Sequence, residues 1–157
     1  RTTLVPEKRA ELTTEGGLDL ARFAADVARG GERLRAAGIT LSLFLDPEPP
    51  LAAIARDVGA SMVEIHTGAY SHATEGPTAD PAAAERELVR IEVAARAFEK
   101  AGLAVHAGHG LTVRNVGALL RRYPFTELSI GHTLVSRSVE VGLAAAVREM
   151  REAMRPL

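Results

Sequence analysis

The sequence contains no cysteine and no tryptophan, and only two of its basic residues, Lys8 and Lys100, are lysines. The absence of cysteine excludes disulfide bonds, thiolate metal sites and a cysteine nucleophile. The shortage of lysine limits Schiff-base chemistry, because Lys100 falls on a predicted helix and only Lys8, in a predicted loop, could reach a substrate carbonyl. This distribution argues against a lysine-dependent aldolase.

The sequence also lacks a long apolar run, a cationic leader and an excess of basic charge. No apolar stretch approaches the roughly 20 residues that cross a bilayer, and no charged start precedes an apolar core as in a signal peptide. The formal net charge is −1, which argues against nucleic acid as a partner. We therefore expect no membrane and no nucleic-acid partner, and a cytoplasmic location. The chain begins at Arg1 rather than Met, from which we expect that an upstream segment is absent.

The 157 residues, of which 46% are hydrophobic and 25% charged, are typical of one globular domain. Within them, short apolar runs alternate with segments of helical period. Between the third and fourth runs, Asp80 and Pro81 mark a helix start and Gly102 a helix end. Strand and helix in alternation predict a parallel sheet with right-handed crossovers. The predicted strands are Thr2–Val5, Thr40–Leu45, Met62–His66, Leu103–Ala107 and Glu127–Ile130.

An open doubly wound sheet and a (βα)8 TIM barrel both fit this alternation. The runs Thr40–Leu45 and Met62–His66 alternate apolar and polar residues, whereas strands covered by helices on both faces should be apolar on both. A barrel strand has one face toward helices and one toward an interior whose upper layer can be polar. The sequence therefore favours a TIM barrel, with a single domain over residues 1–157. Since a complete barrel takes about 250 residues, we expect an incomplete barrel of about five C-terminal βα units.

Histidines gather where the predicted strands end. His66, His109 and His132 fall at or just after the carboxyl ends of three strands. The longest irregular stretches, Pro6–Leu18 and Thr67–Ala79, also follow strands. In TIM barrels this face carries the active site. A functional site at this edge explains the clustering better than three separate structural histidines.

Two Gly-His segments follow the last two predicted strands, Gly108-His109-Gly110 and Gly131-His132. Glycine lets the backbone approach a ligand closely, and the N–H groups at a helix start favour an anion. Barrels often hold phosphate in the loops after their last two strands. The pair of segments therefore predicts a phosphate site, with two plain tight turns as the alternative.

Glu64 lies two residues before His66, so both side chains share one face of their strand. With Val63 and Ile65 facing helices, Glu64 points into the barrel. A carboxylate there must be paired, hydrogen-bonded or protonated. We interpret Glu64 as a catalytic acid, base or charge stabiliser, and a structural ion pair is the alternative.

The stretch Pro6–Leu18 contains two hydroxyls beside two glycines, at Thr13, Thr14, Gly16 and Gly17. Such a segment could close over a bound phosphate, because paired glycines provide hinge freedom. The alternative is a plain loop into a helix, with a threonine as the cap.

A metal site has weak support in the sequence. His106 and His109 have His-x-x-His spacing, but alternation along a strand would put them on opposite faces. Asp46 and Glu64 could add ligands, yet no dense group of carboxylates and histidines is present. We expect no metal.

Six motifs, in the same order and spacing, resemble the pyridoxine 5′-phosphate synthase family, and only Thr67–Ala79 is a few residues longer than in the family. The resemblance covers the whole chain. The motifs are Thr3–Arg9, Thr13–Asp19, Ser42–Asp46, Glu64–Gly68, Ala107–Leu111 and Ile130–His132.

This resemblance implies a (βα)8 barrel of the bacterial cytoplasm that assembles as a homo-octamer. It implies a transferase-class, ring-closing enzyme that condenses 1-deoxy-D-xylulose 5-phosphate with 3-amino-2-oxopropyl phosphate into pyridoxine 5′-phosphate, phosphate and water, without metal or organic cofactor. By position, Thr13 would contact the deoxyxylulose phosphate, Glu64 would stabilise a transition state and His109 would donate a proton. The aminooxopropyl phosphate would be held by Gly110, Gly131 and His132.

The resemblance also implies that further catalytic and binding residues belong to earlier βα units, upstream of Arg1. We therefore expect residues 1–157 alone to be inactive. Two alternatives remain. One is another phosphate-sugar barrel enzyme, such as an isomerase, epimerase or lyase, and the other is a non-catalytic binding module.

Overall fold

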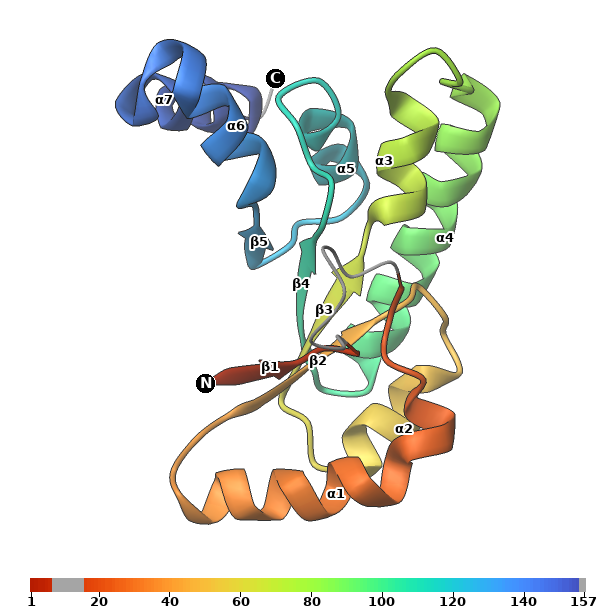
Figure 1. Cartoon of the computed structure of the whole chain (residues 1–157). Helices are drawn as coiled ribbons and strands as arrows, with labels where there is room; N and C mark the ends of the chain where they lie inside the picture. Colours follow the sequence, from red (N-terminus) through yellow and green to blue (C-terminus); the bar gives the residue numbers. More distant parts are fainter. Residues whose placement is uncertain (7–15, 156–157) are drawn as a thin grey trace.

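The computed structural model describes residues 1–6 and 16–155. Within these residues strands and helices alternate, and most helices connect consecutive strands (Figure 1). The strands are β1 (Thr2–Leu4), β2 (Leu41–Leu45), β3 (Met62–His66), β4 (Ala104–Gly108) and β5 (Glu127–Ser129). The helices are α1 (Leu20–Ala36), α2 (Leu51–Asp57), α3 (Gly68–Thr74), α4 (Pro81–Lys100), α5 (Val116–Arg122), α6 (His132–Val141) and α7 (Leu143–Ala153).

The five strands form one parallel sheet in the order β1-β2-β3-β4-β5. A doubly wound sheet reverses its strand order at a switch point, and no reversal occurs among the described strands. Figure 1 shows the strands curling around a concave space, with α1, α2 and α4 outside the curve. The predicted α/β fold with parallel strands is confirmed, and its shape is that of a half-barrel.

The core lies between the convex face of the sheet and the helices. On β2, Leu43 and Leu45 are fully buried, as are Val63 and Ile65 on β3. The predicted apolar face of α4 packs against β3 and β4. Each leucine, isoleucine or phenylalanine on that face contributes about 1.5–3 kcal/mol through burial, and alanine contributes less. The buried side chains of that face are Leu88, Ile91, Ala95 and Phe98.

The ends of α4 confirm the predicted helix signals. The Asp80 carboxylate accepts hydrogen bonds from the N–H groups of Ala82 and Ala83, at 2.9 and 3.1 Å. Pro81 occupies the first turn, where its missing N–H costs nothing. Gly102 follows the helix with a φ of 84°, a conformation that only glycine adopts easily.

The prediction of an irregular stretch over Thr67–Ala79 was wrong in part, because α3 occupies Gly68–Thr74. A helix of two turns is too short to show a hydrophobic period. It is held by tertiary contacts instead, since Tyr70 is 1% exposed and its hydroxyl donates to the Asn115 carbonyl at 2.8 Å. The helical segment after β5 is also split into α6 and α7 at Gly142.

In the described part of the chain, no helix has both the length and the hydropathy that crossing a bilayer requires.

Candidate active site

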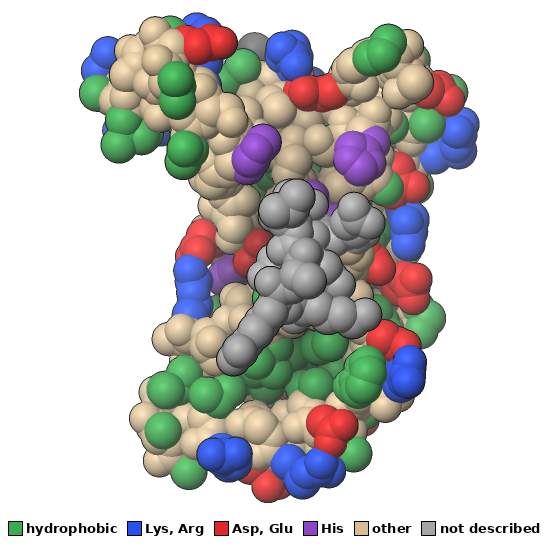
Figure 2. Space-filling model, viewed as in Figure 1, with side chains coloured by type: hydrophobic (Ala, Val, Ile, Leu, Met, Phe, Trp, Pro, Cys, Tyr) green, Lys and Arg blue, Asp and Glu red, His purple; other side chains and the backbone are tan. Residues whose placement is uncertain are grey.

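A cavity of about 460 Å³ lies at the carboxyl ends of the strands, a volume that suits a small ligand. Its wall includes Phe44 from β2 and His72 from α3. Figure 2 shows histidine side chains gathered on this face of the molecule. Thr13 lies outside the described residues. The other five predicted site residues all line this one cavity, and they are Glu64, His109, Gly110, Gly131 and His132.

The junction between β4 and α5 has an unusual backbone. His109 has a φ of 85° and Gly110 a φ of 74°, and such values are uncommon for residues other than glycine. Hydroxyl groups from the β3–α3 segment hold the turn. The Thr67 hydroxyl lies 2.8 and 2.6 Å from the carbonyl oxygens of Gly108 and His109 and shares its one proton between them, and Ser71 donates to the carbonyl of Gly110 at 2.5 Å. Three consecutive carbonyls are thereby fixed, and with them the direction of the His109 side chain.

The junction between β5 and α6 is open toward the cavity. Gly131 precedes the first residue of α6, and a Cβ added there would meet nothing within 4 Å. The first N–H groups of a helix have no partners within it and carry the positive end of the helix dipole. At the start of α6 these groups belong to residues that line the cavity, His132 and Thr133. This junction can therefore accept an anion.

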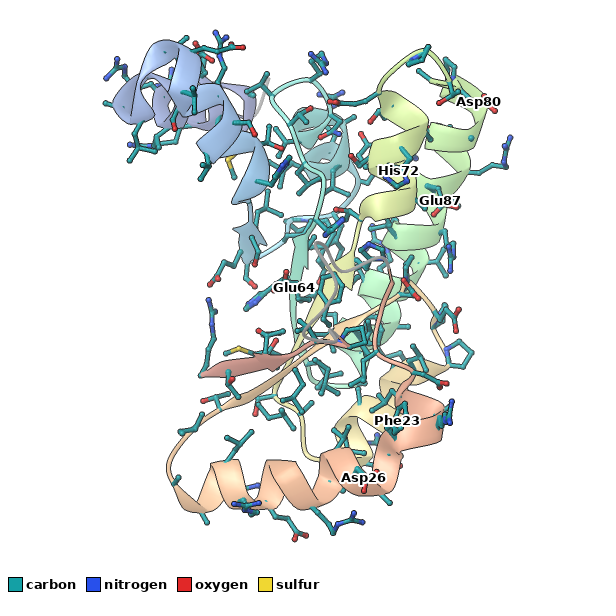
Figure 3. The ribbon with its side chains drawn as sticks, in the orientation of Figure 1. Phe23, Asp26, Glu64, His72, Asp80 and Glu87 are labelled. Carbon is teal, nitrogen blue, oxygen red and sulfur yellow. The ribbon has the colours of Figure 1, made fainter. Side chains whose placement is uncertain are left out.

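Glu64 lies on the concave face of the sheet (Figure 3), in register with Phe44 on β2 and His106 on β4. Burial raises the pKa of the Glu64 carboxyl, while a hydrogen bond from Ser129 and the charge of His106 lower it to a smaller extent. A Cβ added to Gly108 would clash with the Glu64 Oε1 atom. The carboxyl therefore lies against the β4 backbone, close to the turn that holds His109.

Burial lowers the pKa of His109 from its usual value of 6.5, and the charges of His66, His72 and His132 lower it further. These surroundings therefore favour the neutral imidazole. A dianion in the same cavity would oppose these effects, because it stabilises the imidazolium.

One pair of side chains at the site was missed from the sequence. The His66 Nδ1 atom lies 3.0 Å from the Asp46 Oδ1 atom, and the His66 ring packs against the rings of both Phe44 and His109, with centroids 5.1 and 4.9 Å away. The hydrogen bond lowers the pKa of Asp46. The signal was present, since Asp46 follows β2 directly and His66 ends β3, so neighbouring parallel strands bring the two together.

His106 is separate from this histidine group. It is 6% exposed and lies in register with Glu64 and Glu127 on the concave face. His109 reaches the cavity because its left-handed backbone interrupts the strand alternation. Among residues 1–6 and 16–155, no three or more His, Cys, Asp or Glu side chains are grouped so that they could hold a metal ion.

A curled parallel sheet with a cavity at the carboxyl ends of its strands is consistent with an incomplete TIM barrel, and in TIM barrels this face carries the active site. The family profile described as "Pyridoxal phosphate biosynthesis protein PdxJ" matches residues 1–156. The chain belongs to this family, and the resemblance seen in its motifs is confirmed.

Relatives of the chain carry the name pyridoxine 5′-phosphate synthase. The protein of Synechococcus sp. (strain JA-2-3B'a(2-13)) is 49% identical over 154 residues, which are 97% of this chain and 62% of the relative. The protein of Geobacter sp. (strain M21) is 44% identical over 153 residues, which are 98% of this chain and 62% of the relative. The chain thus spans less than two thirds of the length of these relatives.

A solved structure supports the fold. A chain in the crystal structure of the Amycolatopsis orientalis BexX/CysO complex matches 83% of this chain and 48% of its own length, with a TM-score of 0.53 and 18% identity. At this identity the likeness concerns the fold alone.

Proposed function

We propose that the chain provides the phosphate-binding and proton-donating part of a pyridoxine 5′-phosphate synthase. This enzyme would condense 1-deoxy-D-xylulose 5-phosphate with 3-amino-2-oxopropyl phosphate and release phosphate and water. The observation that carries the proposal is one cavity, in a chain of the PdxJ family, that joins Glu64 and His109 to both Gly-His junctions.

The phosphate of the aminoketone would bind at the last two junctions. Gly131 and His132 would present backbone N–H groups at the start of α6, and Gly110, which lines the same cavity, would contact the phosphate from the β4–α5 junction. The fixed turn at His109 supports this assignment, because a preorganised site binds an anion without the cost of ordering the loop.

The proton chemistry would belong to His109 and Glu64. Ring closure involves dehydration, so a group must give protons to leaving hydroxyls. A histidine with a pKa near neutrality can do so and recover the proton afterwards. A fixed carboxylate in a buried position can stabilise cationic imine character as it develops, which is the role proposed for Glu64.

The second phosphorylated substrate needs its own place. A second cavity of about 490 Å³ adjoins the first and shares His72 and His109 with it. Gly16 also lines it, three residues after Thr13 in the sequence. We assign the deoxyxylulose phosphate to this side, with Thr13 as a contact. Two cavities that meet at one imidazole suit a reaction that joins two substrates.

The whole enzyme would be a cytoplasmic, transferase-class homo-octamer that needs no metal or organic cofactor. Exposed apolar side chains support self-association, since Val89 and Val93 on α4 are 45% and 52% exposed. The described sheet has two edges, β1 and β5, which the earlier βα units of a complete barrel would cover.

The test is pyridoxine 5′-phosphate formation by the natural polypeptide that carries residues 1–157. The proposal predicts a product that requires both substrates and forms after treatment with a chelator. Turnover of a single sugar phosphate, with no effect of the aminoketone phosphate, would instead indicate an isomerase, epimerase or lyase. The absence of any turnover would support a binding module.

A further inference from the structure

We propose that Asp46 and His66 form a positioning pair for His109, and that this pair connects the segment before α1 to the proton donor. This inference rests on the proposed function. It concerns two residues that line the second cavity beside His109 and that have been given no role above.

The first observation is the bonding of Asp46. Its carboxylate accepts from the His66 Nδ1 atom at 3.0 Å and from the backbone N–H of Gly17. The backbone around Gly17 lies very close to the end of β2, because a Cβ added there would clash with the Asp46 nitrogen. The N–H of Leu18 also donates to the Phe44 carbonyl at 2.8 Å. Asp46 therefore connects the chain entering α1 to the histidines.

The second observation is the packing of His66. Its side chain is 9% exposed, and its Nε2 atom is buried without a hydrogen-bond partner among the described residues. A carboxylate that accepts from Nδ1 selects the tautomer with the proton on Nδ1, which leaves an unshared electron pair on Nε2. Such a buried acceptor without a partner is costly in a native structure. We interpret the unpartnered Nε2 atom as a feature that lowers stability and is retained because the His66 ring has a role in function.

The third observation is the contact with His109. The two rings meet edge to face, at 4.9 Å and 69°. Gly68 makes this approach possible, because a Cβ there would lie 2.5 Å from the His66 Nε2 atom and 3.3 Å from the His109 Cδ2 atom. The His66 ring thus packs against one side of His109, which also lines the first cavity.

Together these contacts hold the His66 ring in one orientation against His109. Asp46 sets the ring and its tautomer, and the ring sets the position of His109. Both residues also line the second cavity, but the role proposed for them is to hold His109 in place and not to bind substrate. Displacing a reacting group by about 1 Å can lower the rate by roughly 100-fold, so the pair should act mainly on kcat and less on KM.

The test compares Asp46→Asn, His66→Asn and the control Asp26→Asn, an exposed carboxylate on α1, in the natural polypeptide that carries residues 1–157. An amide has one acceptor oxygen. If that oxygen still accepts the hydrogen bond from the Gly17 N–H, the NH₂ group of the asparagine faces the His66 Nδ1 atom. This donor requires an unprotonated Nδ1, so the ring proton moves to Nε2. Histidine ¹⁵N spectra should show this change of tautomer, and kcat should fall by roughly 10- to 100-fold with a smaller change in KM.

The variant His66→Asn keeps a hydrogen-bond donor for Asp46 but removes the imidazole ring that packs against His109. Asparagine can still donate to Asp46 but cannot support or repel the neighbouring imidazole. The groups facing His109 would then be His72 from α3 and His132 from α6, with Glu64 across the cavity. The pKa of His109 should rise, which would move the pH dependence of kcat to higher pH. Asp26→Asn should change neither spectrum nor rate.

The positioning pair is rejected if Asp46→Asn leaves both the His66 tautomer and kcat unchanged, or if His66→Asn lowers only stability. These spectra need no substrate. A wild-type protein with the expected tautomer but no pyridoxine 5′-phosphate synthesis would contradict the proposed function alone.

Discussion

At the scale of single residues, the site depends on a histidine in a backbone conformation that histidine seldom adopts. His109 has a φ of 85°, and hydroxyls of Thr67 and Ser71 fix the carbonyls around it. Strain of this kind costs about 1–3 kcal/mol and persists where the surroundings over-determine it. The strained conformation directs the imidazole into the cavity, which is where the proposed proton donor must lie.

Two substitutions of His109 should distinguish the effect of its backbone strain on stability from the effect of its imidazole on activity. We expect His109→Ala to lower kcat by roughly 10²–10⁴, the usual contribution of a general acid. Asparagine tolerates the left-handed region better than alanine does. His109→Asn should therefore lose as much activity but less stability, as judged from kcat and from the thermal midpoint. A change confined to KM in both variants would remove the proton-donor role.

The protonation of His109 should respond to a bound anion. Burial and neighbouring imidazoles lower its pKa below 6.5, so the charged form is disfavoured. A phosphate dianion stabilises the charged form, and the pKa should rise when inorganic phosphate or product binds. An NMR titration of the His109 ring with and without phosphate measures this shift. An equal or lower pKa in the bound state would place the phosphate elsewhere.

At the scale of elements, the two Gly-His junctions look alike in sequence but differ in space. At Gly131 an added methyl group meets nothing, whereas at Gly110 it would clash with the Ser71 hydroxyl. Gly110 also has a φ of 74°. One junction is therefore open toward the ligand, and the other is packed against α3.

This difference predicts opposite effects of the same substitution. Gly131→Ala should change the free energy of unfolding by less than about 0.5 kcal/mol, as for substitutions away from packed features, but should weaken phosphate binding. Gly110→Ala should destabilise the protein by about 1–3 kcal/mol through backbone strain and crowding. Denaturant unfolding and phosphate titration of both variants test this. Equal stability losses would show that the junctions are equivalent.

The strands and the long helices could be predicted because their signals are local. The run Met62–His66 alternates clearly, and α4 carries a cap at Asp80 and a stop at Gly102. Helix α3 could not be predicted, since two turns show no period and its stability comes from Tyr70 in the core. The left-handed turn at His109 likewise follows from contacts made far along the chain.

The members of the cavity could be predicted, because strand ends in a parallel sheet converge on one edge. The closeness of Asp46 and His66 could also be predicted from their places at the ends of neighbouring strands, but their hydrogen bond could not. It depends on the register between β2 and β3 and on rotamers, neither of which the spacing determines. Thr13 lies outside the described residues and stays a prediction.

At the scale of the whole molecule, the sheet curls far enough to bring the starts of β1 and β5 into contact. Arg1 donates two hydrogen bonds to the Glu127 carboxylate, one of them at 2.7 Å, and this pairing lowers the pKa of Glu127. Ser42 is buried on β2 with an unpartnered hydroxyl among the described residues. A complete barrel would place further strands beside β1 and β5.

The chain spans 62% of the length of the Synechococcus and Geobacter relatives. We therefore expect residues 1–157, expressed alone, to form no pyridoxine 5′-phosphate. Joining them to the earlier βα units of a relative should restore synthesis, because those units would supply the remaining catalytic groups. A native rate of synthesis from residues 1–157 alone would contradict the expectation that the other βα units supply catalytic groups.

The most direct test of the central claim is a crystal structure with pyridoxine 5′-phosphate and inorganic phosphate bound. We predict a phosphate within hydrogen-bond distance of the backbone N–H groups at the start of α6, beside Gly131 and His132, with the His109 imidazole facing the ligand. A phosphate bound away from both Gly-His junctions, with His109 turned from it, would contradict the claim.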